Sequence, residues 1–449
     1  MMKRLKMRVL PIVLTALMIL PNNFIYAEEE EASTDNSPRE VTSTEVGSTE
    51  EDKSEIVSTE SEKDTADKEV DLVAESEEES LDSEIIEETK GSEEVTKEEP
   101  TKEDPIAEGS IDAEDEREAI NQIYLNGETG DDNNDGSSLD SPLKTFNKAK
   151  AIAEENKDIK EIIVSGTVPI EGVITLEGTS AKVIRADNFN DYLFSVESGK
   201  TASLKAIVIE GNLDNPNVEK SLIHVKGNKD GASATLNIQD KAVLRNNEVK
   251  VRTDDNDDLT FGGAILAENN STVNMQGGLI EGNTSDRGGG ICLEDSTLNI
   301  SAGTIRNNLK VNHNKFQVFG GAVYTINSEV NMTGGLIEKN EATYGGGIFV
   351  DKKSKLAFSA GTIQNNKAKL HGPDASEQEY AAGGGICADH GSEINLSNEA
   401  KILKNHSDRV GGGISIGSNQ PTDLANYLNM HGGRVEGNTA YVTGGGIFV

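Results

Sequence analysis

Acidic residues recur at one position of the chain, and they are the first candidates for chemistry. Glu268, Glu294, Asp351 and Asp389 each fall three residues after the aliphatic residue that closes a repeated glycine phrase. Cleavage of acidic polysaccharides needs paired carboxylates, or an Asp cluster that holds Ca²⁺ beside an Arg or Lys base. Catalysis requires one special place, whereas recurrence at one structural position of the repeat is what a turn preference predicts. We therefore interpret the four acids as solvated turns and predict no catalytic residue.

Two Asp-Arg pairs and six histidines receive the same interpretation. The pairs begin at Asp286 and Asp408, and each precedes a glycine phrase. The histidines are scattered, and none pairs with a Cys at metal-ligand spacing. We predict no metal and no cofactor; the histidines are His224, His313, His371, His390, His406 and His431.

One stretch mimics the start of a calcium loop. Asp131, Asn133 and Asp135 alternate ahead of Gly136, as in the first half of an EF-hand. Pro142 stands where the bidentate Glu should be, so the stretch is no EF-hand. A capped turn is the favoured interpretation, and Ca²⁺ binding by these three residues stays open.

The two cysteines occupy one repeated position. Cys292 and Cys387 both follow a Gly-Gly-Gly-Ile phrase and lie three repeats apart. Stacked strands lie about 4.8 Å apart, so the two sulfurs are separated by roughly 14 Å, beyond the reach of a disulfide. We predict two reduced, inward-facing thiols.

These residues must be positioned by an internal repeat. A Gly-Gly-(Gly/Ala)-Ile/Val phrase occurs seven times, and an Asn follows about 20 residues later. Self-similarity at a period of 25 to 39 residues is typical of a solenoid, whose repeats bury their apolar faces only by stacking. The phrases begin at Gly262, Gly288, Gly320, Gly345, Gly383, Gly411 and Gly444; the closing residues, with two earlier counterparts, are Asn212, Asn247, Asn283, Asn308, Asn340, Asn366, Asn405 and Asn438.

The repeat length decides the type of solenoid. The shortest repeat has 25 residues, which accommodates three short β-branched strands and three turns without a helix. We predict an all-β fold: a right-handed, three-sided parallel β-helix over residues 161–449, with the Asn side chains stacked along one corner. The last repeat stops in its first strand, so we expect the β-helix to be truncated.

A short helix should cover the first coil. Ser141 is a good N-cap and Pro142 suits the first helical turn. Leu143, Phe146 and Ala149 then recur at helical spacing towards residue 156. We predict that residues 121–160 form an N-terminal cap of the solenoid.

Two insertions lengthen the same part of the repeat. Residues 309–319 and 367–382 both lie between the closing Asn and the next glycine phrase, two repeats apart, and a third insertion lies near 418–425. Recognition residues concentrate in loops on rigid frames, so the first two are a candidate joint contact surface. Packing against the solenoid flank is the alternative for their larger side chains, which are His313, Phe316, Val318, Leu370, His371, Pro373 and Tyr380.

The N-terminal quarter has a different composition. Residues 1–27 combine a basic start, an apolar run and a small-residue end at Ala27, which predicts a cleaved secretory signal peptide. Residues 28–120 hold 37 Asp and Glu against 8 Lys and Arg and no aromatic residue, which predicts a disordered acidic tether. The formal charge of -37 argues against nucleic acid as a partner. No later stretch is long and apolar enough to span a membrane. We expect a secreted or cell-surface monomer.

Two motifs resemble known families. The pairing of Gly-Gly-Ala-Ile with phrases such as Ile280-Glu-Gly-Asn283 resembles the repeat of chlamydial polymorphic outer membrane proteins, in which the second phrase usually begins with Phe. The stretch from Asp131 to Ala149 resembles the N-terminal cap of pectate-lyase-like β-helix proteins. The resemblance implies a bacterial surface adhesin, or a binding scaffold, whose partner is a host surface, a matrix component or a polysaccharide. The alternative is a lyase or glycoside hydrolase acting on acidic polysaccharide, although residues 28–449 lack the Asp-Gly-His and Arg-x-Lys signatures of polygalacturonases.

Overall fold

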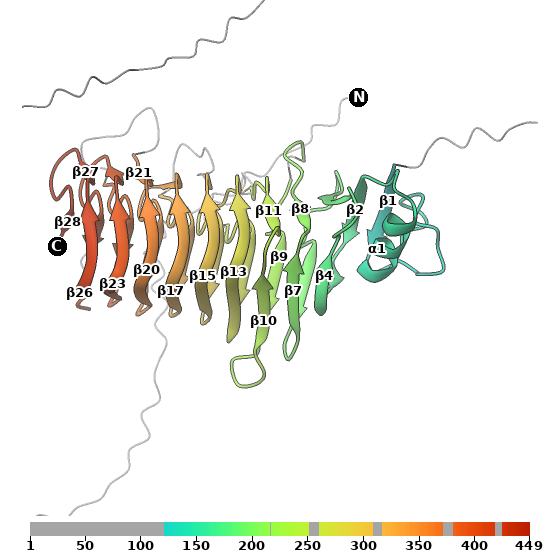
Figure 1. Cartoon of the computed structure of the whole chain (residues 1–449), viewed down its shortest axis with the longest axis horizontal. Helices are drawn as coiled ribbons and strands as arrows, with labels where there is room; N and C mark the ends of the chain where they lie inside the picture. The colour runs from blue at the N-terminus through green and yellow to red at the C-terminus, as the bar shows by residue number, and fades with distance from the viewer. Residues whose placement is uncertain (1–120, 216, 251–259, 309–316, 371–379, 418–423) are drawn as a thin grey trace, which may run out of the picture. The chain divides into compact units, whose positions relative to one another are not determined.

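The computed structural model describes residues 121–215, 217–250, 260–308, 317–370, 380–417 and 424–449. The predictions of a signal peptide and an acidic tether fall on residues 1–120 and lie outside this part. The described chain folds as a parallel β-helix, as predicted, in which strands of successive coils pair side by side (Figure 1).

Three parallel sheets form the sides of the coils. The first contains fourteen strands: β1 (Gln122–Asn126), β2 (Glu161–Gly166), β4 (Gly172–Thr175), β5 (Lys182–Arg185), β7 (Thr201–Lys205), β8 (Val208–Glu210), β10 (Ala234–Ile238), β11 (Val243–Arg245), β13 (Ser271–Glu281), β15 (Thr297–Arg306), β17 (Glu329–Glu338), β20 (Lys355–Gln364), β23 (Glu393–Leu403) and β26 (Tyr427–Glu436). The second contains ten: β3 (Val168–Pro169), β6 (Phe194–Glu197), β9 (Ile223–Lys226), β12 (Ile265–Glu268), β14 (Ile291–Glu294), β16 (Val323–Ile326), β19 (Ile348–Asp351), β22 (Ile386–Ala388), β25 (Ile414–Ile416) and β28 (Ile447–Phe448). The third contains four: β18 (Glu341–Ala342), β21 (Lys367–Ala368), β24 (His406–Ser407) and β27 (Thr439–Ala440).

The long strands of the first sheet differ from the expected pattern of short ones. From β13 onwards each is 10 or 11 residues long and covers two of the predicted strands. A glycine allows this: Gly335 has φ +79°, and the pairing of β17 with β20 shifts register between Thr333 and Leu336. Pairing therefore continues on both sides of the bend.

The repeated glycine phrase forms a corner that only glycine fits. Gly345 has φ +61°, a left-handed conformation that strains side-chain-bearing residues. A Cβ on Gly346 would lie 2.6 Å from the carbonyl oxygen of Gly384 in the next coil. The phrase recurs because each coil approaches the next one this closely.

The predicted Asn stack runs through the interior of one corner. Each backbone N–H from Asn247 to Asn405 donates to the Oδ1 of the next closing Asn, at 2.8–3.2 Å. The prediction is wrong for Asn212, whose Nδ2 donates to Asp187 Oδ1 at 2.7 Å. The buried guanidinium of Arg185 ends the stack instead, because its Nη2 donates to Asn247 Oδ1 at 3.2 Å. We call this seven-residue stack the inner Asn ladder.

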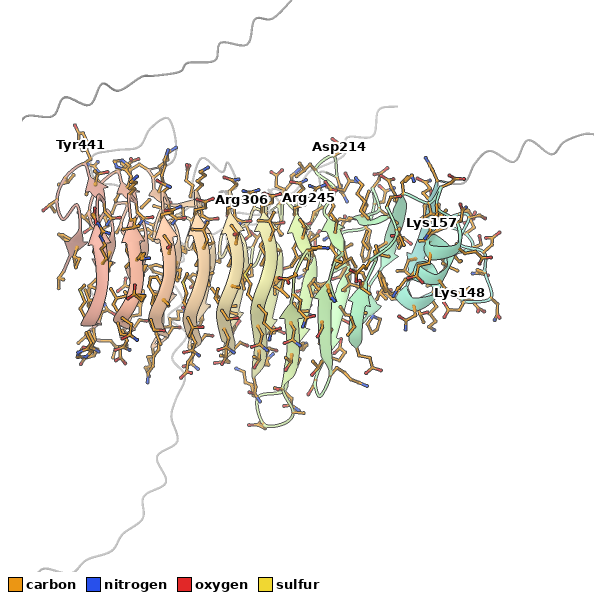
Figure 2. The ribbon with its side chains drawn as sticks, viewed as in Figure 1. Lys148, Lys157, Asp214, Arg245, Arg306 and Tyr441 are labelled. Atoms are coloured by element: carbon orange, nitrogen blue, oxygen red, sulfur yellow. The ribbon has the colours of Figure 1, made fainter. Side chains whose placement is uncertain are left out.

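The outward side of the first sheet carries ladders of its own. Asn274 Nδ2 donates to Asn237 Oδ1, and Asn299 and Asn331 continue the pattern at 2.8–3.1 Å. A neighbouring column alternates in charge: Arg245 pairs with Glu210 at 3.2 Å and Arg306 with Glu281 at 2.9 Å. Figure 2 shows both arginines on the same edge of the sheet. These polar ladders are where the stacked coils meet solvent.

Helix α1 (Phe146–Glu155) begins later than predicted. Its N-cap is Thr145, whose side chain accepts a hydrogen bond from the Lys148 N–H, and not Ser141. Leu143 forms a parallel bridge with Leu125 of β1, which keeps residues 141–143 extended. The helix packs beside β1 at the first coil (Figure 1). No described helix is long and apolar enough to cross a bilayer.

Candidate functional site

The outer face of the second sheet carries a second apolar cluster. Side chains alternate along each strand, so Ile291, Val323 and Ile348 point into the β-helix while their next neighbours point outward. The outward residues form one column across the sheet, and each is at most 2% exposed. They are Cys292, Tyr324, Phe349 and Cys387.

A second column covers these side chains. Phe261, Arg287, Phe319 and Tyr344 stand directly before the glycine phrases and bridge one another in register. The rings of Phe319 and Tyr344 stack with centroids 5.3 Å apart, and the Arg287 guanidinium lies 5.4 Å from the centroid of the Tyr324 ring. We call the two columns together the aromatic cluster.

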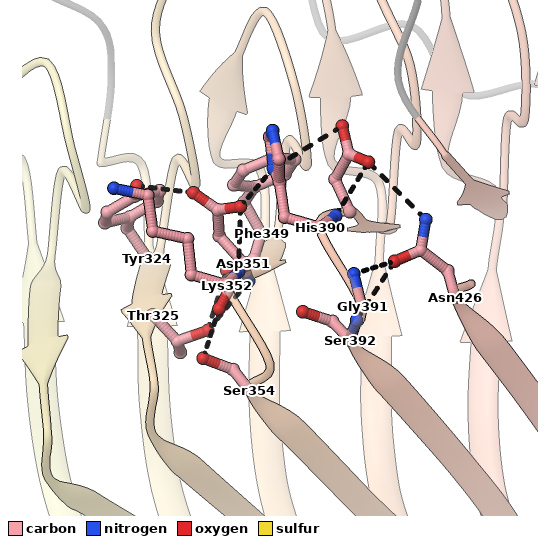
Figure 3. A network of polar contacts seen from close by, with 11 residues as sticks. Tyr324, Thr325, Phe349, Asp351, Lys352, Ser354, His390, Gly391, Ser392 and Asn426 are labelled. Carbon is pink, nitrogen blue, oxygen red and sulfur yellow. Dashed lines mark hydrogen bonds and ion pairs between the residues drawn. The ribbon is translucent and has the colours of Figure 1, made fainter. Parts of the chain in front are cut away.

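A carboxylate–imidazole network adjoins the aromatic cluster (Figure 3). Asp351 Oδ2 accepts a hydrogen bond from the Tyr324 hydroxyl at 2.8 Å, and its Oδ1 lies 2.6 Å from His390 Nδ1. Asp389 Oδ2 lies 3.8 Å from the same nitrogen, and Asn426 Nδ2 donates to Asp389 Oδ1 at 3.4 Å. The Asp351 side chain is 6% exposed, whereas His390 is 38% exposed. The imidazole therefore shields the carboxylate from solvent.

The electrostatics favour a charged imidazole. The hydrogen bond to Asp351 raises the pKa of His390 above 6.5; burial opposes this shift, and the charges of Asp351 and Asp389 support it. Burial, followed by the charge of Asp351, raises the pKa of Tyr324. The imidazole therefore keeps its proton to a higher pH than an unperturbed histidine does. Among the described residues, the His390 ring contacts only the carboxylates of Asp351 and Asp389 through its Nδ1.

A second histidine–carboxylate pair lies further along the same face. His224 Nε2 is 3.2 Å from Glu268 Oε1, and Lys226 Nζ approaches the same oxygen at 3.8 Å. The ring of Tyr192 stacks on His224 with centroids 4.4 Å apart. The hydrogen bond from His224 lowers the pKa of Glu268, although burial opposes the shift. The outer face therefore presents two separate imidazole–carboxylate pairs.

The interpretation of the recurring acids as solvated turns is wrong for Asp351 and Asp389, which are 4% and 1% exposed. Glu268 and Glu294 are half-buried. The aromatic cluster covers this side of the sheet, a feature that the acid spacing alone does not reveal. One signal in the sequence could have pointed to this site. The turns after β12, β14, β16 and β19 of the second sheet have residues with left-handed φ that are Asn, Asp or Lys, whereas the turn after β22 has His390.

The Asp-Arg pairs also differ from solvated turns. Asp286 is buried and accepts hydrogen bonds from the backbone N–H and the hydroxyl of Thr260, at 3.0 and 2.9 Å. Asp408 is half-buried and accepts from the Leu370 N–H at 3.0 Å. Both carboxylates hold neighbouring segments in place.

The stretch from Asp131 to Asp135 is a capped turn in this structure, the interpretation that the sequence favoured. Asp131 Oδ1 accepts from the Asn133 N–H at 2.9 Å, and Asp135 Oδ1 accepts from the Ser137 N–H at 2.9 Å. No group of three or more His, Cys, Asp or Glu among the described residues is placed to hold a metal ion.

The cysteines share one column, as predicted, and both are free and buried. The prediction that they face inward is wrong. Ile291 and Ile386 take the inward positions, so the alternation turns Cys292 and Cys387 to the outer side. The aromatic cluster buries them there.

The described ends of the two insertions are held by residues of neighbouring coils. Val318 is buried, and its N–H donates to the Thr343 hydroxyl at 3.2 Å. Tyr380 is half-buried and stacks on Tyr344 with centroids 6.4 Å apart. The Leu370 N–H donates to Asp408 at 3.0 Å. The other predicted contact residues, which are His313, Phe316, His371 and Pro373, lie outside the described residues.

Comparison with protein-family models, with curated proteins and with solved structures gave no match. The function must therefore be argued from the chain itself.

Proposed function

We propose that the protein is an exported cell-surface scaffold that binds a partner on the outer face of the second sheet. The observation that carries this proposal is the position of the two insertions. They rejoin the β-helix at Phe319 and Ala382, two coils apart in one bridged column, with Tyr344 between them. Recognition residues concentrate in insertions on a rigid frame.

The aromatic cluster supplies an apolar base for such a surface. Phe319, at the end of the first insertion, belongs to this cluster, and the partly buried Tyr380, at the end of the second, packs against it. Aromatic side chains dominate the energetics of many interfaces because they bury a large area at low entropic cost. The repeat's resemblance to chlamydial polymorphic outer membrane proteins, which are adhesins, supports adhesion as the role. The basic and apolar start of the chain supports export.

The test is deletion of 309–316 and 371–379, each replaced by a short linker of the length found in the other repeats. We expect adhesion to cultured host cells or immobilised extracellular matrix to be lost while β-rich circular dichroism and melting persist. Deletion of 418–423, at a different position in the repeat, is the matched control and should leave adhesion unchanged. Unchanged adhesion in the double deletion would reject the proposal.

A polysaccharide-cleaving enzyme is the second candidate, and the network around His390 and Asp351 is the observation that favours it. If the purified protein turned over pectin-like or glycosaminoglycan substrates, the enzyme would be favoured over the binding scaffold. Such turnover should disappear in Asp351→Asn and persist in the loop deletions.

A further inference from the structure

A cavity of about 460 Å³ opens on the outer side of the first sheet at its first coils. Tyr124, Ile163 and Ile184 occupy consecutive rows of β1, β2 and β5, paired in register. Their chain neighbours are buried in the core, so these three side chains point outward and form the floor of the cavity. The volume falls within the range of small-molecule sites, about 300–1,000 Å³.

The floor is a fixed, largely apolar platform. Gln122 Nε2 donates to the Tyr124 hydroxyl at 2.6 Å, which holds the phenol in place. Ile163 and Ile184 extend the surface across the next two strands, and the half-exposed Leu139 lies at the edge. Because the platform belongs to hydrogen-bonded strands, a ligand gains contact without ordering a loop.

The rim is polar and has hydrogen-bonding capacity to spare. Asn212 Nδ2 donates to Asp187 Oδ1 at 2.7 Å, which leaves the second carboxylate oxygen as an acceptor. Asn188 is exposed, and its side-chain amide makes no hydrogen bond to another described residue. Ser165 also lines the cavity. Amides, a hydroxyl and a carboxylate together suit a ligand whose hydroxyls both donate and accept.

The charge of the lining restricts the ligand further. Glu161 and Asp187 are acidic, and Glu161 pairs with Lys182 at 3.7 Å. The cation that borders the cavity, Arg185, turns its guanidinium inward to core carbonyl groups and Asn247. An anionic ligand would therefore meet two carboxylates without a free cation.

We propose that this cavity binds one or two sugar units of a neutral polysaccharide, with a pyranose ring stacked on Tyr124 and its hydroxyls bonded to Asn188 and Asp187. The site lies on a different sheet from the binding surface proposed above and does not depend on it.

The test is calorimetric titration of the full chain with neutral cello-, xylo- and manno-oligosaccharides, beside oligogalacturonate and chitosan oligosaccharides. We expect a neutral oligosaccharide to bind, and Tyr124→Ala to weaken binding about tenfold through loss of the stacking contact. Tyr124→Phe should retain most of the affinity because the ring remains, and Asn188→Ala should weaken binding severalfold. Tyr441→Ala, at an exposed tyrosine of the last described coil, is the matched control (Figure 2).

Three outcomes would overturn the proposal. They are no binding of any neutral oligosaccharide at millimolar concentration, equal affinity in Tyr124→Ala, and a preference for the cationic chitosan fragments. If Tyr124→Ala lowers the melting temperature, the affinity of Asn188→Ala still tests the proposal, because Asn188 is exposed and its substitution should leave the fold intact. The loop deletions described above should leave this binding unchanged, which separates the two proposals.

Discussion

His390 Nδ1 and Asp351 Oδ1 are 2.6 Å apart, although 39 positions separate the two residues in the chain. They belong to neighbouring coils, whose strands β19 and β22 pair in register. His390 reaches back over the carboxylate because its backbone takes φ +50°, a conformation that Asn and Asp adopt in the equivalent turns. The two residues therefore meet because neighbouring coils stack, and not because they are close in the sequence.

This pair predicts a pH-dependent stability. The folded-state pKa of His390 lies above 6.5, so its contribution is complete below about pH 6.5 and is lost as the pH rises through the folded value. We expect the urea midpoint of the wild type to fall more steeply above pH 6.5 than that of His390→Asn, which retains the left-handed turn. His431→Asn, at an exposed histidine, is the control. Equal slopes in the wild type and His390→Asn would contradict the prediction.

The inner Asn ladder predicts a large and position-specific loss of stability. Asn340 Nδ2 donates to the Ile305 and Glu338 carbonyl oxygens at 3.0 Å, and its Oδ1 accepts the Asn308 N–H at 3.0 Å. Asn340→Ala leaves several buried groups unpaired, at about 1–3 kcal/mol for each. We expect the free energy of unfolding in urea to fall by roughly 3 kcal/mol or more.

The same coil offers a matched control for that substitution. Asn331 belongs to the outward ladder of β17, where water can replace a lost partner, and the next coil has Ala357 in the same column. Asn331→Ala should cost less than about 1 kcal/mol. Similar losses for Asn331→Ala and Asn340→Ala would show that burial does not distinguish the two ladders.

The β-helix could be predicted from the repeat because the repeated residues have the conformations and hydrogen-bonding groups that the backbone needs at each turn. The left-handed φ of Gly345 and the buried amide of Asn340 recur wherever coils turn, so period and residue type were sufficient. The burial of Asp351 was not predictable in this way. Strand alternation tells which side chains leave the core, but not that Tyr324 and Phe349 meet again outside it. The choice of Thr145 over Ser141 as N-cap likewise depended on a tertiary contact, the bridge between Leu143 and Leu125.

The outward but covered cysteines predict slow thiol chemistry. Burial raises the pKa of both Cys292 and Cys387, so neither forms the reactive thiolate readily. We expect a thiol reagent at pH 8 to label neither cysteine in the folded protein and both in denaturant without reductant. Failure to find two thiols in the unfolded protein, at unchanged monomer mass, would contradict the assignment of free cysteines.

The last prediction concerns the buried end of the inner Asn ladder. The Arg185 guanidinium donates to the Lys220 and Ser221 carbonyl oxygens and to Asn247, each at 3.2 Å. Burial lowers its pKa to about 10, so it is still charged at neutral pH. Lysine has one donor group and cannot reproduce this fork. Since hydrogen bonds to charged groups contribute about 1.5–3 kcal/mol each, we expect Arg185→Lys to lower the free energy of unfolding by roughly 3 kcal/mol or more.

Arg245→Lys is the matched control, because it makes the same substitution at a partly exposed arginine. Arg245 belongs to the partly exposed charge column and pairs with Glu210 at 3.2 Å, so its replacement should cost less than about 1 kcal/mol. Urea denaturation of both variants at pH 7 measures the difference. A loss for Arg185→Lys no larger than that for Arg245→Lys would mean that Arg185 does not stabilise the end of the ladder. A larger loss would identify a single buried cation as the group that closes a stack made otherwise of neutral amides.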